Sequence, residues 1–211
     1  MTSRLLNLFS LALVLNGACS ALTAQEGSAL LKGQTVYVAI SPQQAVVTAE
    51  CEVLVDAADD QREAAFYLPV YASSESTSSQ VLRDSNIVVQ AGSGREYKLV
   101  GTTPPEHLEP IETTAPVHWF VLLMDDVEPG VPGQSFKLHI SYRQRLVNGQ
   151  FLYLPLTHHR GSHSLEGRSW SHQLLARRGD KVVRLGNEVE GATLGDTLVV
   201  YLKQLEEVSI K

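Results

Sequence analysis

The chain has 211 residues, a formal net charge of −6 at pH 7, 44% hydrophobic residues and 19% charged residues. This acidic balance argues against nucleic acid or an anionic lipid surface as the main partner, because both need a clustered positive face. The length is sufficient for one large sandwich or two small modules with a substantial core.

Residues 1–24 have the pattern of a cleaved export signal. One positive residue, Arg4, precedes an apolar run over residues 5–15 that is too short to span a bilayer and is followed by small residues. Cleavage after Ser20 or after Ala24 would suit a signal peptidase. Cleavage after Ala24 leaves residues 25–211 as the mature protein, with a net charge of about −7.

Cys19 gives an alternative interpretation of the same segment, a lipoprotein signal. Asn16 stands three positions before this cysteine, where a bulky aliphatic residue is usual. No later stretch is long and apolar enough to cross a membrane. We therefore expect export to the periplasm or the extracellular space, with lipid anchoring through Cys19 as the alternative.

Apolar and polar residues alternate along most of the remaining chain, with β-branched and aromatic residues enriched, and no segment keeps a helical period for three turns. The pattern predicts an all-β protein, an antiparallel β-sandwich that is Ig-like or related to that type. The expected strands are residues 35–40, 45–55, 64–71, 86–91, 97–100, 117–124, 135–147, 150–156, 172–176, 181–185 and 197–205.

Two connections are predicted to be antiparallel. Asn148 and Gly149 tolerate the positive φ that a two-residue hairpin turn needs, so residues 135–147 and 150–156 should pair as a hairpin. The polar residues 56–61 predict a second turn, between the strands at 45–55 and 64–71.

Two short segments resemble each other, Tyr-Leu-Pro-Val at residues 67–70 and Tyr-Leu-Pro-Leu at residues 153–156. They allow an internal duplication with two similar halves, or two packed modules with a boundary near residues 102–116. The alternative is that Leu-Pro is a convenient strand end, since proline donates no ladder hydrogen bond. The serine-rich residues 72–79 predict a mobile surface loop.

Four of the seven histidines lie within residues 154–172, which raises the hypothesis of a zinc or copper site. The candidate ligands are His158, His159, His163 and His172. His159 and His163 are four residues apart, as in helical zinc-binding pairs, but the glutamate that would make this pair a hydrolase motif is absent. A solvated polar loop is the competing interpretation of the same residues.

A basic cluster stands out on this acidic chain. Arg177, Arg178 and Arg184 could dock an anionic polymer or an acidic partner through their guanidinium groups. Trp170, beside the histidine-rich stretch, is the aromatic residue expected to be exposed. The alternative is that these arginines solvate an exposed strand edge and discourage aggregation.

Residues typical of nucleophilic catalysis are not assembled into a motif. The segment Gly92-Ser93-Gly94 lacks the spacing of a nucleophile elbow, and Cys51 alternates with apolar neighbours in a strand pattern, as a small buried hydrophobe does. We therefore expect a non-catalytic β-sandwich of the cell envelope that binds an envelope protein or a polymer, with no cofactor. The alternatives are a metal-binding protein or metal-dependent enzyme that uses residues 158–172, and a small-ligand carrier, which would need a cavity.

Overall fold

The structure is a computed structural model of the chain. It describes residues 29–55, 64–73, 75–104, 112–124, 135–158, 171–179, 181–183, 191–194, 197–202 and 206–211. The predicted export signal and Cys19 lie outside these residues. Within the described part of the chain, no helix is long and apolar enough to span a membrane.

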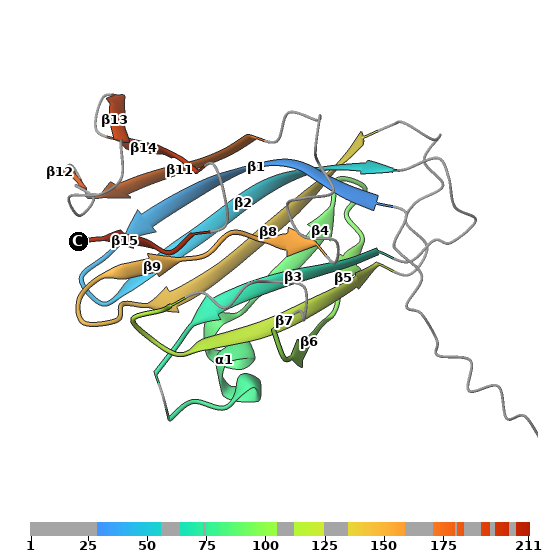
Figure 1. Ribbon diagram of the computed structural model, residues 1–211, viewed down its shortest axis with the longest axis horizontal. Helices are drawn as coiled ribbons and strands as arrows, with labels where there is room; N and C mark the ends of the chain where they lie inside the picture. Colours follow the sequence, from blue (N-terminus) through green and yellow to red (C-terminus); the bar gives the residue numbers. More distant parts are fainter. Residues whose placement is uncertain are drawn as a thin grey trace, which may run out of the picture.

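The protein has the predicted all-β fold, built as a sandwich of sheets (Figure 1). The large sheet has the strand order β13-β14-β11-β1-β2-β8-β4-β5, with β12 paired to β11. Its strands are β1 (Ala29–Ile40), β2 (Gln44–Val55), β4 (Val88–Ala91), β5 (Glu96–Tyr97), β8 (Ser135–Arg145), β11 (Ser171–Arg178), β12 (Lys181–Val182), β13 (Gly191–Leu194) and β14 (Thr197–Tyr201).

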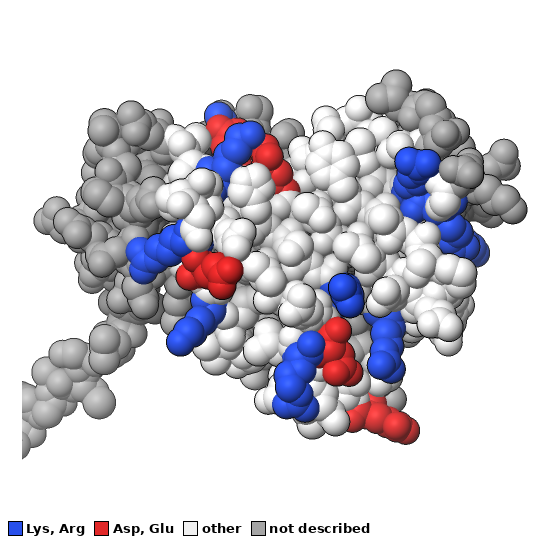
Figure 2. Space-filling model, turned by 180° about the vertical axis from the view of Figure 1, so that it is seen from behind, with Lys and Arg blue, Asp and Glu red and all other residues white. Residues whose placement is uncertain are grey.

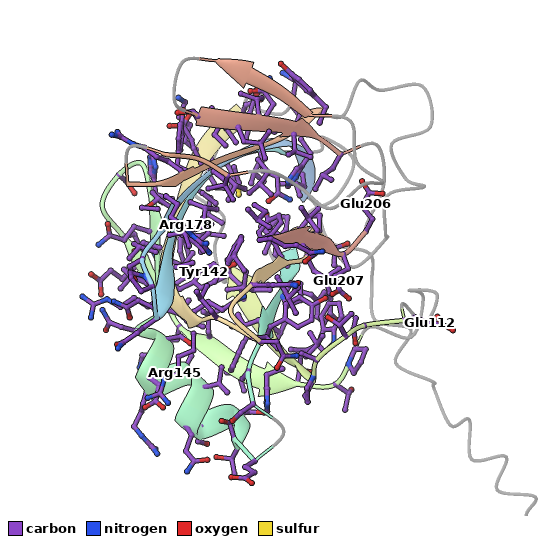
Figure 3. The ribbon with its side chains drawn as sticks, turned by 90° about the vertical axis from the view of Figure 1, so that its left-hand side faces the viewer. Glu112, Tyr142, Arg145, Arg178, Glu206 and Glu207 are labelled. Atoms are coloured by element: carbon purple, nitrogen blue, oxygen red, sulfur yellow. The ribbon has the colours of Figure 1, made fainter. Side chains whose placement is uncertain are left out.

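A second layer covers one face of the large sheet, as Figure 1 and the edge-on view in Figure 3 show. It consists of the small sheet, with strand order β10-β3-β7-β6, and a two-stranded C-terminal pair, β15-β9. The strands of this layer are β3 (Ala64–Tyr71), β6 (Leu99–Thr102), β7 (Val117–Met124), β9 (Phe151–Tyr153), β10 (Thr157–His158) and β15 (Val208–Ile210).

The core lies between the two layers because alternation directs one side of each strand inward. In β1, Val36 and Val38 are buried, whereas Tyr37 between them is 54% exposed. Cys51 is fully buried in the same way, and burial raises the pKa of its thiol to about 12. This confirms that Cys51 is a packed hydrophobe. Six aromatic residues are buried as well: Tyr71, Trp119, Phe120, Tyr142, Phe151 and Tyr153.

The predicted hairpin at Asn148 and Gly149 is confirmed only as a turn. Both residues have positive φ, and Val147 and Gln150 exchange hydrogen bonds, but pairing between the two strands stops there. Residues 151–156 are all buried, without alternation, so they cannot continue a sheet that has one solvated face. The chain instead crosses into the second layer, where β9 pairs with β15.

The predicted antiparallel pairing of residues 45–55 with residues 64–71 is wrong. β2 pairs with β1 and β8 in the large sheet, whereas β3 pairs with β7 and β10 in the small sheet. Alternation fixes which side of a strand is buried but leaves its partner open. The residues that join the two strands lie outside the described part.

Part of the predicted serine-rich loop is a helix, α1 (Ser78–Ser85). Thr77 and Gln80 form a capping box at its start: the Thr77 amide donates to the Gln80 side chain at 2.8 Å, and the Gln80 amide donates to the Thr77 hydroxyl at 3.3 Å. Gly101 lets the helix approach β6 closely, since a Cβ there would lie 3.1 Å from the Cβ of Ser78. The helix is too short to show a helical period in the sequence.

Candidate functional site

The structure describes two of the four predicted metal ligands. His158 lies in β10, opposite Phe66 of β3. His172 lies in β11, where it is 3% exposed and its ring centroid is 5.8 Å from that of Tyr153. Burial lowers the pKa of His172 to about 3, so the imidazole is neutral at pH 7.

His159 and His163 lie outside the described residues. Among the residues that are described, no three or more His, Cys, Asp or Glu side chains form a group that could hold a metal ion. The zinc or copper site at residues 158–172 therefore stays a prediction.

The predicted basic cluster is described in part, because Arg184 and Trp170 lie outside the described residues. Arg177 is exposed, and its Nε donates to the Gly179 carbonyl at 2.6 Å. Alternation along β11 places Arg178 on the opposite side of the strand, and its Nε is buried. The two neighbouring arginines thus lie on different faces of the large sheet.

The outer face of the large sheet carries a feature that was not predicted, an uncharged row across five strands. The strand registers place Leu175 of β11 beside Tyr37 of β1, Tyr37 beside Thr48 of β2, Thr48 beside Ser141 of β8, and Ser141 beside Val88 of β4. Side chains at paired positions point to the same side of a sheet. This row runs across the face that the second layer leaves open.

Uncharged residues extend the row on both sides. Tyr201 lies opposite Gln173, which is next to Thr35, and Val46 lies opposite Ala39. Tyr201 is 58% exposed and Val46 is 41% exposed. We call this surface the central band: Thr35, Tyr37, Ala39, Val46, Thr48, Val88, Ser141, Gln173, Leu175 and Tyr201.

Charged side chains border the central band, and Figure 2 shows the uncharged area between them. Lys32 pairs with Glu52 at 2.8 Å, and Lys137 pairs with Glu50 at 2.5 Å. The hydrogen bonds from these lysines lower the pKa of both carboxyl groups, which therefore stay ionised at neutral pH. Arg143 and Arg177 flank the other side, opposite Val46 and Ala39.

A second site is a cleft of about 520 Å³ between α1, the end of β8 and the segment that precedes β7. We call it the α1 cleft. The polar side chains along it come from Gln44, Ser73, Ser76, Asp84, Ser85, Thr114, Arg143, Arg145 and Asn148, and the apolar ones from Tyr71, Ala72, Val81, Ala115, Pro116, Leu146 and Val147. Figure 3 places Arg145 beside α1.

One wall of the α1 cleft is fixed by the C-terminal segment. The Glu207 carboxylate accepts hydrogen bonds from the Thr114 amide at 3.1 Å and from the Thr114 hydroxyl at 2.7 Å. The Ala72 amide donates to the Pro116 carbonyl at 3.2 Å, which joins this wall to the end of β3. Burial and the nearby Glu207 carboxylate raise the pKa of Tyr71, whose phenol therefore stays neutral.

Sequence reasoning missed both surfaces. The residues of the central band come from six strands, and alternation does not reveal which strands are neighbours. The α1 cleft depends on a helix that was predicted as a loop. The presence of Arg143 and Arg145 two positions apart in a strand was the available signal, because it places two guanidinium groups on one face.

No family model matches the sequence, and no curated protein is similar to it. Among solved structures, yeast LTA4 hydrolase in complex with bestatin is 7% identical, with a TM-score of 0.42, and the match covers 87% of this chain and 29% of that enzyme. A substrate-bound mutant of the M1 zinc metallopeptidase from Deinococcus radiodurans is 9% identical, with a TM-score of 0.44 and coverages of 87% and 42%. This chain thus spans less than half of the length of either enzyme. Similarity at this level supports no transfer of activity.

Proposed function

We propose that the protein is an exported, non-catalytic module of the cell envelope that binds another protein through the central band. The observation that carries this proposal is the uncharged row across five strands, with Tyr37 and Tyr201 more than half exposed. Large exposed hydrophobic side chains that gather on one face and are bordered by charged residues, as Tyr37, Val46 and Tyr201 do here, are typical of an interaction site on a soluble protein.

The composition of the central band favours a protein partner. The centres of protein interfaces are depleted of charged residues and enriched in tyrosine, and their rims are polar. Tyr37 and Tyr201 match the centre, and the ion pairs Lys32–Glu52 and Lys137–Glu50 match the rim. Exposed ion pairs contribute little to stability, and charged groups at the rim of an interface can orient a partner and exclude wrong ones.

The regular strands beneath the surface also support a binding role over a catalytic one. The band is a sheet face made of side chains from regular strands, which hold their positions without ordering a loop. Tyrosine offers a large contact area and loses rotational freedom about only two side-chain bonds. Both features lower the entropic cost of association.

The test is a capture experiment from envelope extracts with three forms of the full chain. These are the wild type, the double variant Tyr37→Ser/Tyr201→Ser, and Val100→Ser as the matched control, because Val100 is 56% exposed but lies on β6 in the small sheet. We expect the wild type and the control to retain the same protein and the double variant to lose it. With that protein purified, the double variant should bind about tenfold or more weakly.

Equal retention by all three forms would remove the central band as the binding surface. Retention of a polysaccharide instead of a protein would overturn the choice of partner. Circular dichroism and thermal unfolding of each form establish that a loss of binding is not a loss of fold.

A further inference from the structure

The structure assigns to the α1 cleft a second binding site, for a short peptide with a free amino terminus and a free carboxyl terminus. In this assignment Arg143 and Arg145 hold the peptide carboxylate, and Asp84 holds its ammonium group. The site shares Arg143 with the border of the central band but contains none of the band's own residues, and it does not depend on the function proposed for the band.

Charged side chains of both signs line the α1 cleft. Arg143 and Arg145 line the cleft from β8, and Asp84 lines it from α1. All three side chains are exposed, and within the described part of the chain no ion pair joins them to each other or to another residue. Elsewhere on the same sheet, lysines and glutamates do pair. Opposite charges that face one cavity without neutralising each other are available to a ligand that carries both.

Arg143 and Arg145 suit a carboxylate better than a phosphate. A guanidinium group binds a carboxylate through two parallel hydrogen bonds, and two arginines at alternate positions of a strand present two such groups on one side. A phosphate would also suit the arginines, but Asp84 on the facing wall would repel a dianion. A ligand with a single carboxylate and an ammonium group satisfies both walls.

Apolar and polar side chains share the interior of the cleft. Tyr71, Val81 and Ala115, all of which are buried, line it together with Ser73, Ser76 and Thr114. A volume of about 520 Å³ falls in the range of small-ligand sites. With nine polar and seven apolar residues, the lining is more polar than that of most such sites.

The end of β8 favours a peptide over a free amino acid as the ligand. The pairing of β8 with β4 ends at Ser141, so the remaining part of β8, up to Arg145, has no strand on that side among the described residues. The cleft runs along this part of β8. An unpaired strand edge presents backbone groups that an extended peptide can pair with.

Isothermal titration calorimetry of the full chain with the tripeptide alanyl-leucyl-alanine tests the assignment. The same tripeptide with an acetylated amino terminus and with an amidated carboxyl terminus provides the matched ligands. We expect the free tripeptide to bind, and each modification to weaken binding about tenfold or more. The affinity should also fall as salt is added.

The variants Asp84→Asn and Arg145→Gln test which terminus of the tripeptide each of these two side chains binds. Asp84→Asn should weaken binding of the free tripeptide but should not weaken binding of the acetylated tripeptide any further. Arg145→Gln should likewise weaken binding of the free tripeptide but should not weaken binding of the amidated tripeptide any further. Arg83→Gln is the control, because Arg83 is exposed on α1 next to Asp84 but does not line the cleft. It should leave the affinity within about twofold.

Absence of binding by the free tripeptide would overturn the assignment. So would binding that acetylation and amidation leave unchanged, or binding that Arg83→Gln weakens as much as Arg145→Gln does. The Tyr37→Ser/Tyr201→Ser variant should keep full affinity for the tripeptide, which distinguishes a failure of this site from a failure of the central band.

Discussion

At the scale of single residues, His172 is a titratable group placed in a hydrophobic core. Its ring packs against Tyr153, and burial lowers its pKa from an ordinary value of 6.5 to about 3. Between these two values the unfolded chain binds a proton that the folded chain does not. The contribution of His172 is therefore neutral above pH 6.5, and it destabilises the fold progressively as the pH falls toward 3.

This predicts a pH-dependent effect of His172→Phe, which keeps a ring at this position and removes the ionisation. Between pH 7 and pH 5, the free energy of unfolding of the wild type should fall by about 2 kcal/mol more than that of the variant. Urea unfolding at both pH values measures the difference. Equal losses in the two proteins would mean that His172 titrates normally in the folded state.

Two buried glutamines replace missing strand partners in the second layer. The Gln34 side chain donates to the Leu156 carbonyl at 2.7 Å, and the Gln144 side chain donates to the Leu152 carbonyl. The Tyr153 hydroxyl donates to Gln34 at 3.3 Å. The chain around residues 152–156 leaves the large sheet, so these side chains satisfy carbonyl groups that a ladder would otherwise satisfy.

We expect Gln34→Leu to lower the free energy of unfolding by about 1–3 kcal/mol, because it leaves the Leu156 carbonyl buried without its donor. Gln43→Leu is the control, since Gln43 is exposed in the turn between β1 and β2, and it should change stability by about 0.5 kcal/mol or less. Denaturant unfolding of the three proteins compares them. A similar effect of both substitutions would argue against a specific role for the buried amide.

At the scale of elements, the sequence predicts most strands but not their partners. The bounds of β3 and β7 agree with the prediction, because polar residues flank a clear apolar run in each. β15 was missed because it has three residues, and β9 was given the wrong partner because the turn before it resembles a hairpin turn. The candidate sites depend on these partners, so they were less predictable than the strands that supply their residues.

The stability of the helix α1 depends on its N-terminal capping box. With eight residues it is too short to be stable alone, so the capping box at Thr77 and contacts with the sheets must hold it. Thr77→Ala should destabilise the protein by about 1 kcal/mol, whereas Thr77→Ser, which keeps the hydroxyl, should cost less. Because α1 supplies Asp84, we also expect Thr77→Ala to weaken tripeptide binding in the α1 cleft.

Thermal unfolding and the same calorimetric titration measure these two effects. If Thr77→Ala and Thr77→Ser were equally stable, the capping box would contribute nothing to the fold.

At the scale of the whole molecule, the C-terminal segment completes the second layer. Val208 and Ile210 of β15 are fully buried, and β15 pairs with β9. Figure 1 shows β15 lying along β9 over the large sheet. Because both side chains pack in the core, we expect β15 to help hold the two layers together.

Ile210→Ala should therefore lower the free energy of unfolding by about 2–5 kcal/mol, as expected for a cavity in a packed core. Ser209→Ala, at the half-buried position between the two core residues, serves as the control and should cost less. Urea unfolding of both variants tests this. A loss below about 0.5 kcal/mol for Ile210→Ala would mean that β15 is dispensable.

The parallel pairing of β1 with β11, at the centre of the large sheet, slows folding. Registers from Gly33–Ser171 to Ala39–Arg177 join strands that are 138 residues apart in the sequence, so β1 keeps one open edge until β11 docks against it. During that time an unpaired apolar edge can pair with other chains. Slow refolding and early aggregation of truncated chains follow from the position of this one strand.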